Sequence, residues 1–73
     1  MTYAQKLRML REQKGLSQKE VADILQTTQQ YYGKYENEQR PLPITHLITL
    51  CRFYVVSSDW LLGLDDEKGE QLQ

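Results

Sequence analysis

Two adjacent glutamines, Gln29 and Gln30, directly follow a threonine, Thr28, and a lysine, Lys34, lies one helical turn further on. A glutamine amide can donate one hydrogen bond and accept another, which matches the major-groove edge of adenine. A lysine at this spacing could bind guanine or a phosphate, and the threonine could contact a thymine methyl group or a phosphate. Neighbouring glutamines are often only a solvated helix face. Their position just after a capped turn favours base reading instead.

The stretch that must position these side chains, residues 17–36, is predicted to form two short helices. Ser17 and Glu20 have the spacing of a capping box, in which each side chain binds the other residue's backbone N–H. The apolar face of this first helix carries Val21, Ala22 and Leu25. After a break at residues 26–27, Thr28 can cap a second helix that runs from Gln29 to about Glu36.

The second of these helices has two different faces. Tyr32, Tyr35 and Glu36 are spaced by three and four residues, so they share one side and are expected to face the interior. The opposite side carries Gln29, Gln30, Gly33 and Lys34. Two short helices, the second with polar residues at its N-terminus, are typical of a helix-turn-helix that inserts this end into a DNA groove.

A longer stretch, LRMLREQKGLSQKEVADILQTTQQYYGKYENEQR, continuing to VSSDWLLG, resembles the lambdoid phage repressor and Cro family, often called the XRE family. The similarity covers roughly residues 3 to 64, and LRxLRxxxGLSQ, VA, YE and SxDWLLG carry it together. It implies an all-α, compact five-helix lambda-repressor-like domain, with the helix-turn-helix at the second and third helices. The implied function is sequence-specific binding of double-stranded DNA by a transcriptional regulator, a repressor that binds a palindromic operator as a homodimer.

The resemblance also assigns roles to particular residues. Those expected to read bases are Thr28, Gln29, Gln30 and Lys34, and TTQQ is similar to the recognition-helix start of phage repressors that read adenine-rich half-sites. The family also places DNA-backbone contacts in the loop after this helix, where Asn37 and Arg40 can make them. From their positions, Gln18 and Lys19 at the positive N-terminal end of the preceding helix are expected to contact the DNA backbone too, as is Tyr31, which departs from the smaller or aliphatic residue of the family pattern. Tyr31 could alternatively touch a dimer partner, and the loop residues could simply be solvated. Arg11 is expected to form a bidentate ion pair with Glu36, although a solvated arginine is the usual alternative.

The sequence departs from the family pattern at the ends of two helices and within a third. Gln26 and Val55 stand where glycine is usual. Gln26 must therefore tolerate a positive φ or form a slightly different turn, and Val55 is β-branched, a type of residue that resists a positive φ. Gly33 lies inside the recognition helix and lowers its intrinsic stability by about 1 kcal/mol relative to alanine. A glycine on this face could let the helix approach the DNA backbone or a thymine methyl group closely, or it could have no functional role.

The remaining helices are predicted from caps and apolar spacing. They cover residues 2–14, ended by Gly15; residues 44–54, with Pro43 as the first helical residue; and a short helix between Ser57 and Gly63. The residues expected to face the core from these helices are Tyr3, Leu7, Leu10, Leu47, Leu50, Tyr54, Trp60 and Leu61, flanked by Ile48 and Cys51.

Composition narrows the class of protein. Residues 1–64 form the expected domain and hold eight Lys and Arg against six Asp and Glu, which leaves +2, whereas the tail 65–73 carries −3 and is expected to be disordered. No apolar run approaches membrane length, so a cytoplasmic protein without membrane contact is expected. The single Cys51 and single His46 argue against a metal site, and no catalytic set or cofactor motif is present, so no enzyme is expected. The low charge leaves open a protein-interaction module, such as an antitoxin.

Overall fold

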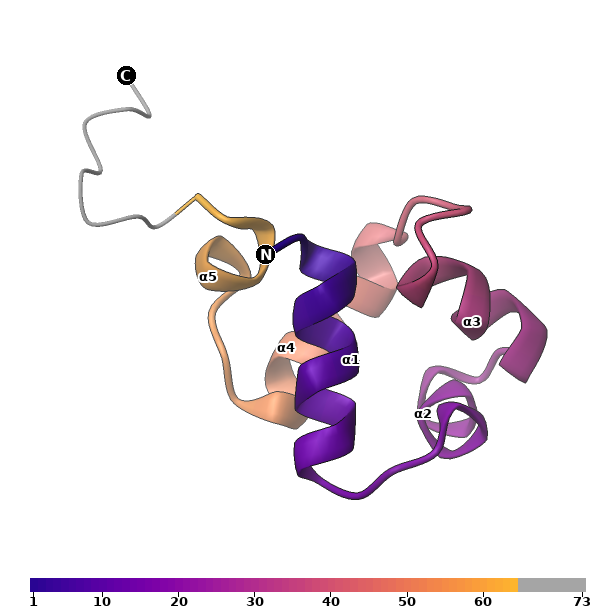
Figure 1. The fold of residues 1–73 in the computed structure, drawn as a ribbon. Helices are drawn as coiled ribbons and strands as arrows, with labels where there is room; N and C mark the ends of the chain where they lie inside the picture. Colours follow the sequence, from indigo (N-terminus) through magenta and orange to yellow (C-terminus); the bar gives the residue numbers. More distant parts are fainter. Residues whose placement is uncertain (65–73) are drawn as a thin grey trace.

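The computed structural model describes residues 1–64, which form five α-helices (Figure 1). The helices are α1 (Tyr3–Gln13), α2 (Gln18–Leu25), α3 (Gln29–Glu36), α4 (Ile44–Tyr54) and α5 (Ser58–Leu62). The all-α, five-helix prediction is therefore confirmed, with α2 and α3 in the positions of the helix-turn-helix. The acidic tail, residues 65–73, lies outside the described residues.

Side-chain hydroxyls begin four of the five helices. Thr2, Ser17, Thr28 and Ser57 each accept a hydrogen bond from a backbone N–H of the first turn that follows. Thr2 and Ser17 form complete capping boxes, with Gln5 and Glu20 respectively as the second member. Because these contacts depend only on neighbouring residues, short sequence patterns could predict them.

Three helices lead into a residue with a left-handed backbone. Gln26 has φ 59° at the end of α2, Val55 has φ 58° at the end of α4, and Gly63 has φ 79° at the end of α5. Gly15 has φ 69° just beyond α1. The predicted positive φ at Gln26 and Val55 is confirmed, so two residues with side chains occupy a conformation that glycine adopts more easily.

The core lies where the helices converge. Its buried members are Leu7, Val21, Ala22, Leu25, Tyr32, Tyr35, Leu47, Leu50, Tyr54 and Leu61, with Ala4 also buried on α1. Trp60, Leu10 and Tyr3 are partly buried against this cluster. In Figure 1, α2 and α3 lie together on one side of α1, and α5 lies on the other. Contacts of α3 with both α2 and α1 fix the orientation of the helix that carries the glutamines.

Two predictions about α4 are wrong. Pro43 precedes the helix as its N-cap with φ −62° and ψ 148°, an extended conformation, and Ile44 is the first helical residue. Ile48 does not flank the core but is 48% exposed, because it shares the outer face of α4 with Ile44.

No helix within residues 1–64 is long and apolar enough to cross a membrane.

Candidate nucleic-acid interface

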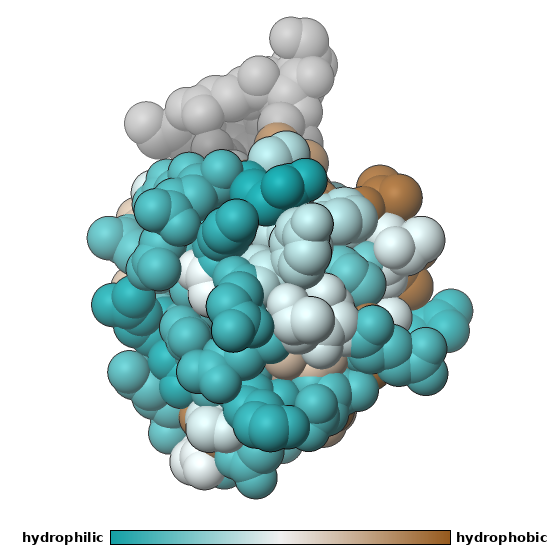
Figure 2. Space-filling model, turned by 90° about the vertical axis from the view of Figure 1, so that its right-hand side faces the viewer, coloured by the Kyte–Doolittle hydropathy of each residue, from teal (hydrophilic) through white to brown (hydrophobic). Residues whose placement is uncertain are grey.

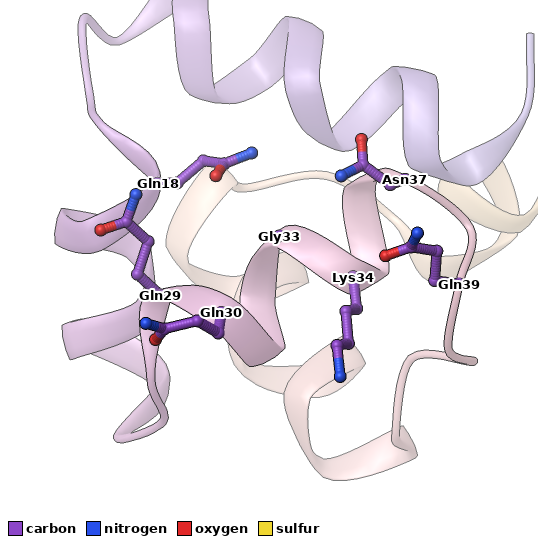
Figure 3. Close-up of a pocket in the computed structure, with 7 residues that line it drawn as sticks. All are labelled: Gln18, Gln29, Gln30, Gly33, Lys34, Asn37 and Gln39. Atoms are coloured by element: carbon purple, nitrogen blue, oxygen red, sulfur yellow. The ribbon is translucent and has the colours of Figure 1, made fainter.

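A shallow groove of about 420 Å³ runs along the polar side of α3 (Figure 3). Its lining comes from the start of α2, the length of α3 and the following loop: Gln18, Gln29, Gln30, Gly33, Lys34, Asn37 and Gln39. Apart from one glycine and one lysine, all of these side chains are carboxamides, which present both donors and acceptors. The groove can therefore form paired hydrogen bonds with a partner that offers both kinds of group.

The first turn of α3 presents the two glutamines. Gln29 and Gln30 are exposed, and neither forms a side-chain hydrogen bond within residues 1–64. Thr28 is partly engaged, since the backbone N–H of Tyr31 donates to its Oγ1 at 3.2 Å. This cap leaves the threonine hydroxyl proton able to donate outward. Three consecutive polar side chains thus stand at the N-terminus of α3, where the helix dipole is positive.

Glu36 holds the inner end of α3 to α1. Arg11 Nε donates to Glu36 Oε2 at 2.7 Å, and Arg11 Nη2 donates to Oε1 at 3.1 Å. Arg11 Nη1 also donates to the Leu16 carbonyl oxygen at 2.9 Å, which ties the same guanidinium to the loop before α2. The Glu36 side chain is fully buried, whereas Arg11 remains 13% exposed. The two residues paired by the resemblance are thus in bidentate contact.

Gln18 joins this network from the start of α2. Its Nε2 donates to Glu36 Oε1 at 3.1 Å. The Gln18 amide was expected to donate hydrogen bonds to the DNA backbone, and one of its two N–H donors is therefore already used inside the protein. The same contact fixes which way the Gln18 amide faces, because only the nitrogen can donate to a carboxylate.

The network changes the ionisation of its members. Burial of the Glu36 carboxylate works to raise its pKa, but hydrogen bonds, that of Arg11 foremost, outweigh burial and hold the pKa below its usual value. The same hydrogen bond raises the pKa of Arg11. Burial, followed by the nearby Glu36 carboxylate, raises the pKa of Tyr32, and burial raises the pKa of Tyr54 to about 12. At neutral pH the ion pair is fully charged and both tyrosines are neutral.

Tyr31 does not line the groove, and two cations lie near its ring. The residue is 44% exposed, with Lys34 Nζ 5.6 Å and the Arg40 guanidinium carbon 5.1 Å from its ring centre. Cations within about 6 Å of an aromatic face are attracted to it. The Tyr31 ring therefore attracts both a lysine of α3 and an arginine of the next loop.

The loop after α3 contributes a residue that the sequence did not single out as a site residue, Gln39. Glu38 adopts φ 59°, and the Gln39 N–H donates to the Lys34 carbonyl oxygen at 2.8 Å. This reversal brings Gln39 back to the groove beside Asn37. Asn37 Oδ1 also accepts a 3.4 Å hydrogen bond from Arg8 of α1. The sequence signal for Gln39 was a second carboxamide close to Asn37. The left-handed backbone of Glu38, which turns Gln39 towards the groove, could not be inferred from residue type.

The other sequence-predicted residues lie near the groove but not all within it. Lys19 is on the exposed side of α2, with its Nζ 3.4 Å from Asp23 Oδ2. Gly33 was placed on the outward face of α3, but it is buried beneath the Gln18 side chain.

The face that bears α2 and α3 is covered mainly by hydrophilic residues (Figure 2). No group of three or more His, Cys, Asp or Glu side chains within residues 1–64 could hold a metal ion.

The helix-turn-helix family model matches residues 7–61 of the chain. Two similar proteins come from Bacillus subtilis (strain 168). The uncharacterized HTH-type transcriptional regulator YobD is 35% identical over 71 residues, which is 97% of this chain and 63% of YobD. The HTH-type transcriptional regulator ImmR is 33% identical over 66 residues, which is 90% of this chain and 52% of ImmR. The chain thus spans between half and two thirds of the length of these relatives.

A crystal structure of a transcriptional regulator from Listeria innocua has a similar fold. It superposes with a TM-score of 0.83 at 26% sequence identity, covering 90% of this chain and 62% of that one. An SPbeta prophage-derived uncharacterized HTH-type transcriptional regulator of Bacillus subtilis (strain 168), YonR, is 38% identical over 60 residues. That match covers 82% of this chain and 56% of YonR.

Proposed function

Because the chain belongs to the helix-turn-helix family of transcriptional regulators, of the XRE type, we propose that it binds double-stranded DNA sequence-specifically and acts as a repressor. The observation that carries this proposal is the carboxamide-lined groove along α3, which faces outward on a polar side of the molecule. Paired donors and acceptors on the outer edge of one helix match base edges in a major groove. No catalytic step is part of this function.

In the proposed complex the N-terminus of α3 enters the major groove. Gln29 and Gln30 form hydrogen bonds with base edges, adenine being the best match for a glutamine amide. Thr28, whose Oγ1 already caps α3, contacts a thymine methyl group or a phosphate. Lys34 binds guanine or a phosphate, and its position over Tyr31 favours the phosphate, because it shares that ring with Arg40.

Contacts with the DNA backbone flank these base contacts. Arg40 and Tyr31 bind one strand from the loop side of α3, together with Asn37. Gln18 and Lys19 approach the other strand from the start of α2, where the positive end of the helix dipole favours a phosphate. Such contacts fix the register of the domain on DNA, whereas the α3 glutamines supply the sequence preference.

We further propose that two copies bind a palindromic operator. Residues 1–64 carry a formal charge of only +2, which gives one domain little affinity from phosphate neutralisation alone. Two domains on half-sites about one helical turn apart would combine their affinities. The resemblance suggests α5 and its neighbouring loop as the dimer surface.

Duplex binding as a function of salt tests this function. A labelled pool of random duplexes should be bound at about 50 mM salt, and the affinity should fall steeply as salt approaches about 200 mM, because bound protein releases counterions. Absence of duplex binding at the lower concentration would reject DNA binding by this domain.

The second candidate is a protein-interaction module, such as an antitoxin built on the same fold. The exposed Ile44 and Ile48 on the outer face of α4, together with the low net charge, favour it over an enzyme. Such a module would show no duplex affinity at any salt concentration. It would instead retain a protein partner in a pull-down experiment.

A further inference from the structure

Gly33 is an unexpected residue for the middle of α3. Apart from proline, glycine destabilises the interior of a helix more than any other residue. Gly33 does not have a positive φ, which would have explained why a glycine is needed there. The residue is buried, yet it lines the groove. Its presence therefore needs a reason other than backbone conformation.

The space above Gly33 is occupied by one side chain. A Cβ atom at this position would lie 3.3 Å from Gln18 Oε1 and 3.9 Å from Gln18 Cδ. Outside α3 itself, no other residue of the described chain comes within 4 Å. A methyl group here would consequently press on the Gln18 amide and on nothing else.

The Gln18 amide cannot move away freely, because it is held from the other side. Its Nε2 donates to Glu36 Oε1 at 3.1 Å, and Glu36 is fixed in turn by the bidentate contact with Arg11. The amide thus lies across α3, with its nitrogen on the buried carboxylate and its oxygen over Gly33. Figure 3 shows Gln18 beside Gly33, which lies in the middle of the residues that line the groove.

We propose that Gly33 is a positioning residue of the DNA-binding surface: the missing side chain lets the Gln18 amide lie on α3 in the orientation that Glu36 imposes. This inference rests on the proposed DNA-binding function and adds to it a residue that need not touch DNA. Alanine at position 33 should improve helix formation while it pushes the Gln18 amide out of this orientation by a few tenths of an ångström. Stability and DNA affinity should therefore change in opposite directions.

A double-mutant cycle on a duplex that the unaltered chain binds tests this proposal. The variants are Gly33→Ala, Gln18→Ala and the two combined. We expect Gly33→Ala to keep or raise the melting temperature, by about a few degrees. We expect it to weaken duplex binding about tenfold, the effect of one lost hydrogen bond. In the Gln18→Ala background the same substitution should change affinity by less than about twofold, because no amide remains to be displaced.

Two results would overturn the proposal. One is a Gly33→Ala variant that binds the duplex as tightly as the unaltered chain. The other is an equal loss of affinity in both backgrounds, which would mean that the new methyl group meets DNA directly.

A readout without DNA separates this proposal from the proposed function. The side-chain amide resonances of Gln18 should shift in the NMR spectrum of free Gly33→Ala, whereas those of exposed Gln13 should not. If the unaltered chain binds no duplex and the Gln18 resonances still shift, the packing is as described but the DNA-binding role fails. Unchanged Gln18 resonances would reject the positioning role itself.

Discussion

Glu36 is the one charged residue that is buried within residues 1–64. Its carboxylate accepts two hydrogen bonds from Arg11 and one from Gln18, and Arg8 Nε lies 3.6 Å away. A buried carboxylate is tolerated only when it is paired and hydrogen-bonded, as this one is. At the scale of single residues, therefore, the end of α3 depends on its partners from α1 and α2.

Removing Arg11 should leave that carboxylate buried without its main partner. We expect Arg11→Ala to lower the free energy of unfolding by about 3–5 kcal/mol, as for other broken buried pairs, measured by urea denaturation at pH 7. Arg8→Ala is the matched control, because Arg8 is 51% exposed and its Nε lies 3.6 Å from Glu36, so its removal should cost clearly less than that of Arg11. Equal losses in the two variants would contradict the difference in burial.

Stability should also depend on pH through Glu36. Its pKa is lower in the folded chain than the ordinary value of 4.5, so the folded state binds fewer protons in this range than the unfolded state. The stabilisation is fully present above about pH 4.5 and is lost as the pH falls through the lower, folded-state pKa. Glu36→Gln should be less stable than the unaltered chain at pH 7, and the gap should narrow towards pH 3. Urea midpoints at pH 7, 5, 4 and 3 measure it, and a constant gap would contradict the assignment.

At the scale of helices, the ends of α2 and α4 store backbone strain. Gln26 and Val55 both have a left-handed backbone, and an L-residue pays roughly 1–2 kcal/mol for this conformation. Val55 is β-branched and 85% exposed, so its side chain gains little packing in return. These two turns set the angles at which α3 and α5 leave the preceding helices.

Replacing Val55 should therefore stabilise the chain. We expect Val55→Gly to raise the free energy of unfolding by about 0.5–1 kcal/mol, after subtracting the greater freedom of glycine in the unfolded state. Val55→Ala retains a Cβ and should gain less, so it serves as the control. A thermal melt of the three proteins decides the matter, and a glycine variant less stable than the alanine variant would contradict strain at this turn.

Helix ends were predictable from sequence, because caps and glycines act within a few residues. Ser17 with Glu20, Thr28, Ser57 and Gly63 were all assigned correctly for this reason. The exposure of Ile48 could not be predicted in this way. Its apolar side chain favoured burial, but whether another helix covers it depends on residues far away in the sequence. Only the part of the groove that lies on α3 could be predicted from the sequence. The return of Gln39 depends on the backbone of Glu38, and the Gln18 contact with Glu36 joins residues far apart in the sequence.

At the scale of the whole molecule, charge is sparse and its position matters more than its sum. Residues 1–64 carry +2, and two of the cations, Lys34 and Arg40, each lie within 6 Å of the Tyr31 ring centre. Pre-arranged cations lose less side-chain freedom on binding a phosphate. A weakly charged domain can in this way still present a local basic patch to DNA.

The salt dependence of binding should test the proposed phosphate contacts of Lys34 and Arg40. Lys34→Ala and Arg40→Ala should each reduce the slope of log affinity against log salt by about 1, the change expected for one phosphate contact. Arg52→Ala is the control, because this exposed residue is on α4 and does not line the groove. If Lys34→Ala instead leaves the slope unchanged and relaxes base preference at one position, Lys34 reads guanine.

The central claim is that the first turn of α3 reads bases, and the most direct measurement is selection of bound duplexes from a random pool. The selection should be run with the unaltered chain and with a variant that combines Gln29→Ala and Gln30→Ala. Both substitutions are at exposed positions, so the variant should still fold. We predict a palindromic motif for the unaltered chain and, for the variant, loss of preference at adenine positions within each half-site. An unchanged motif would contradict base reading by these glutamines, and no enrichment with either protein would contradict sequence-specific DNA binding altogether.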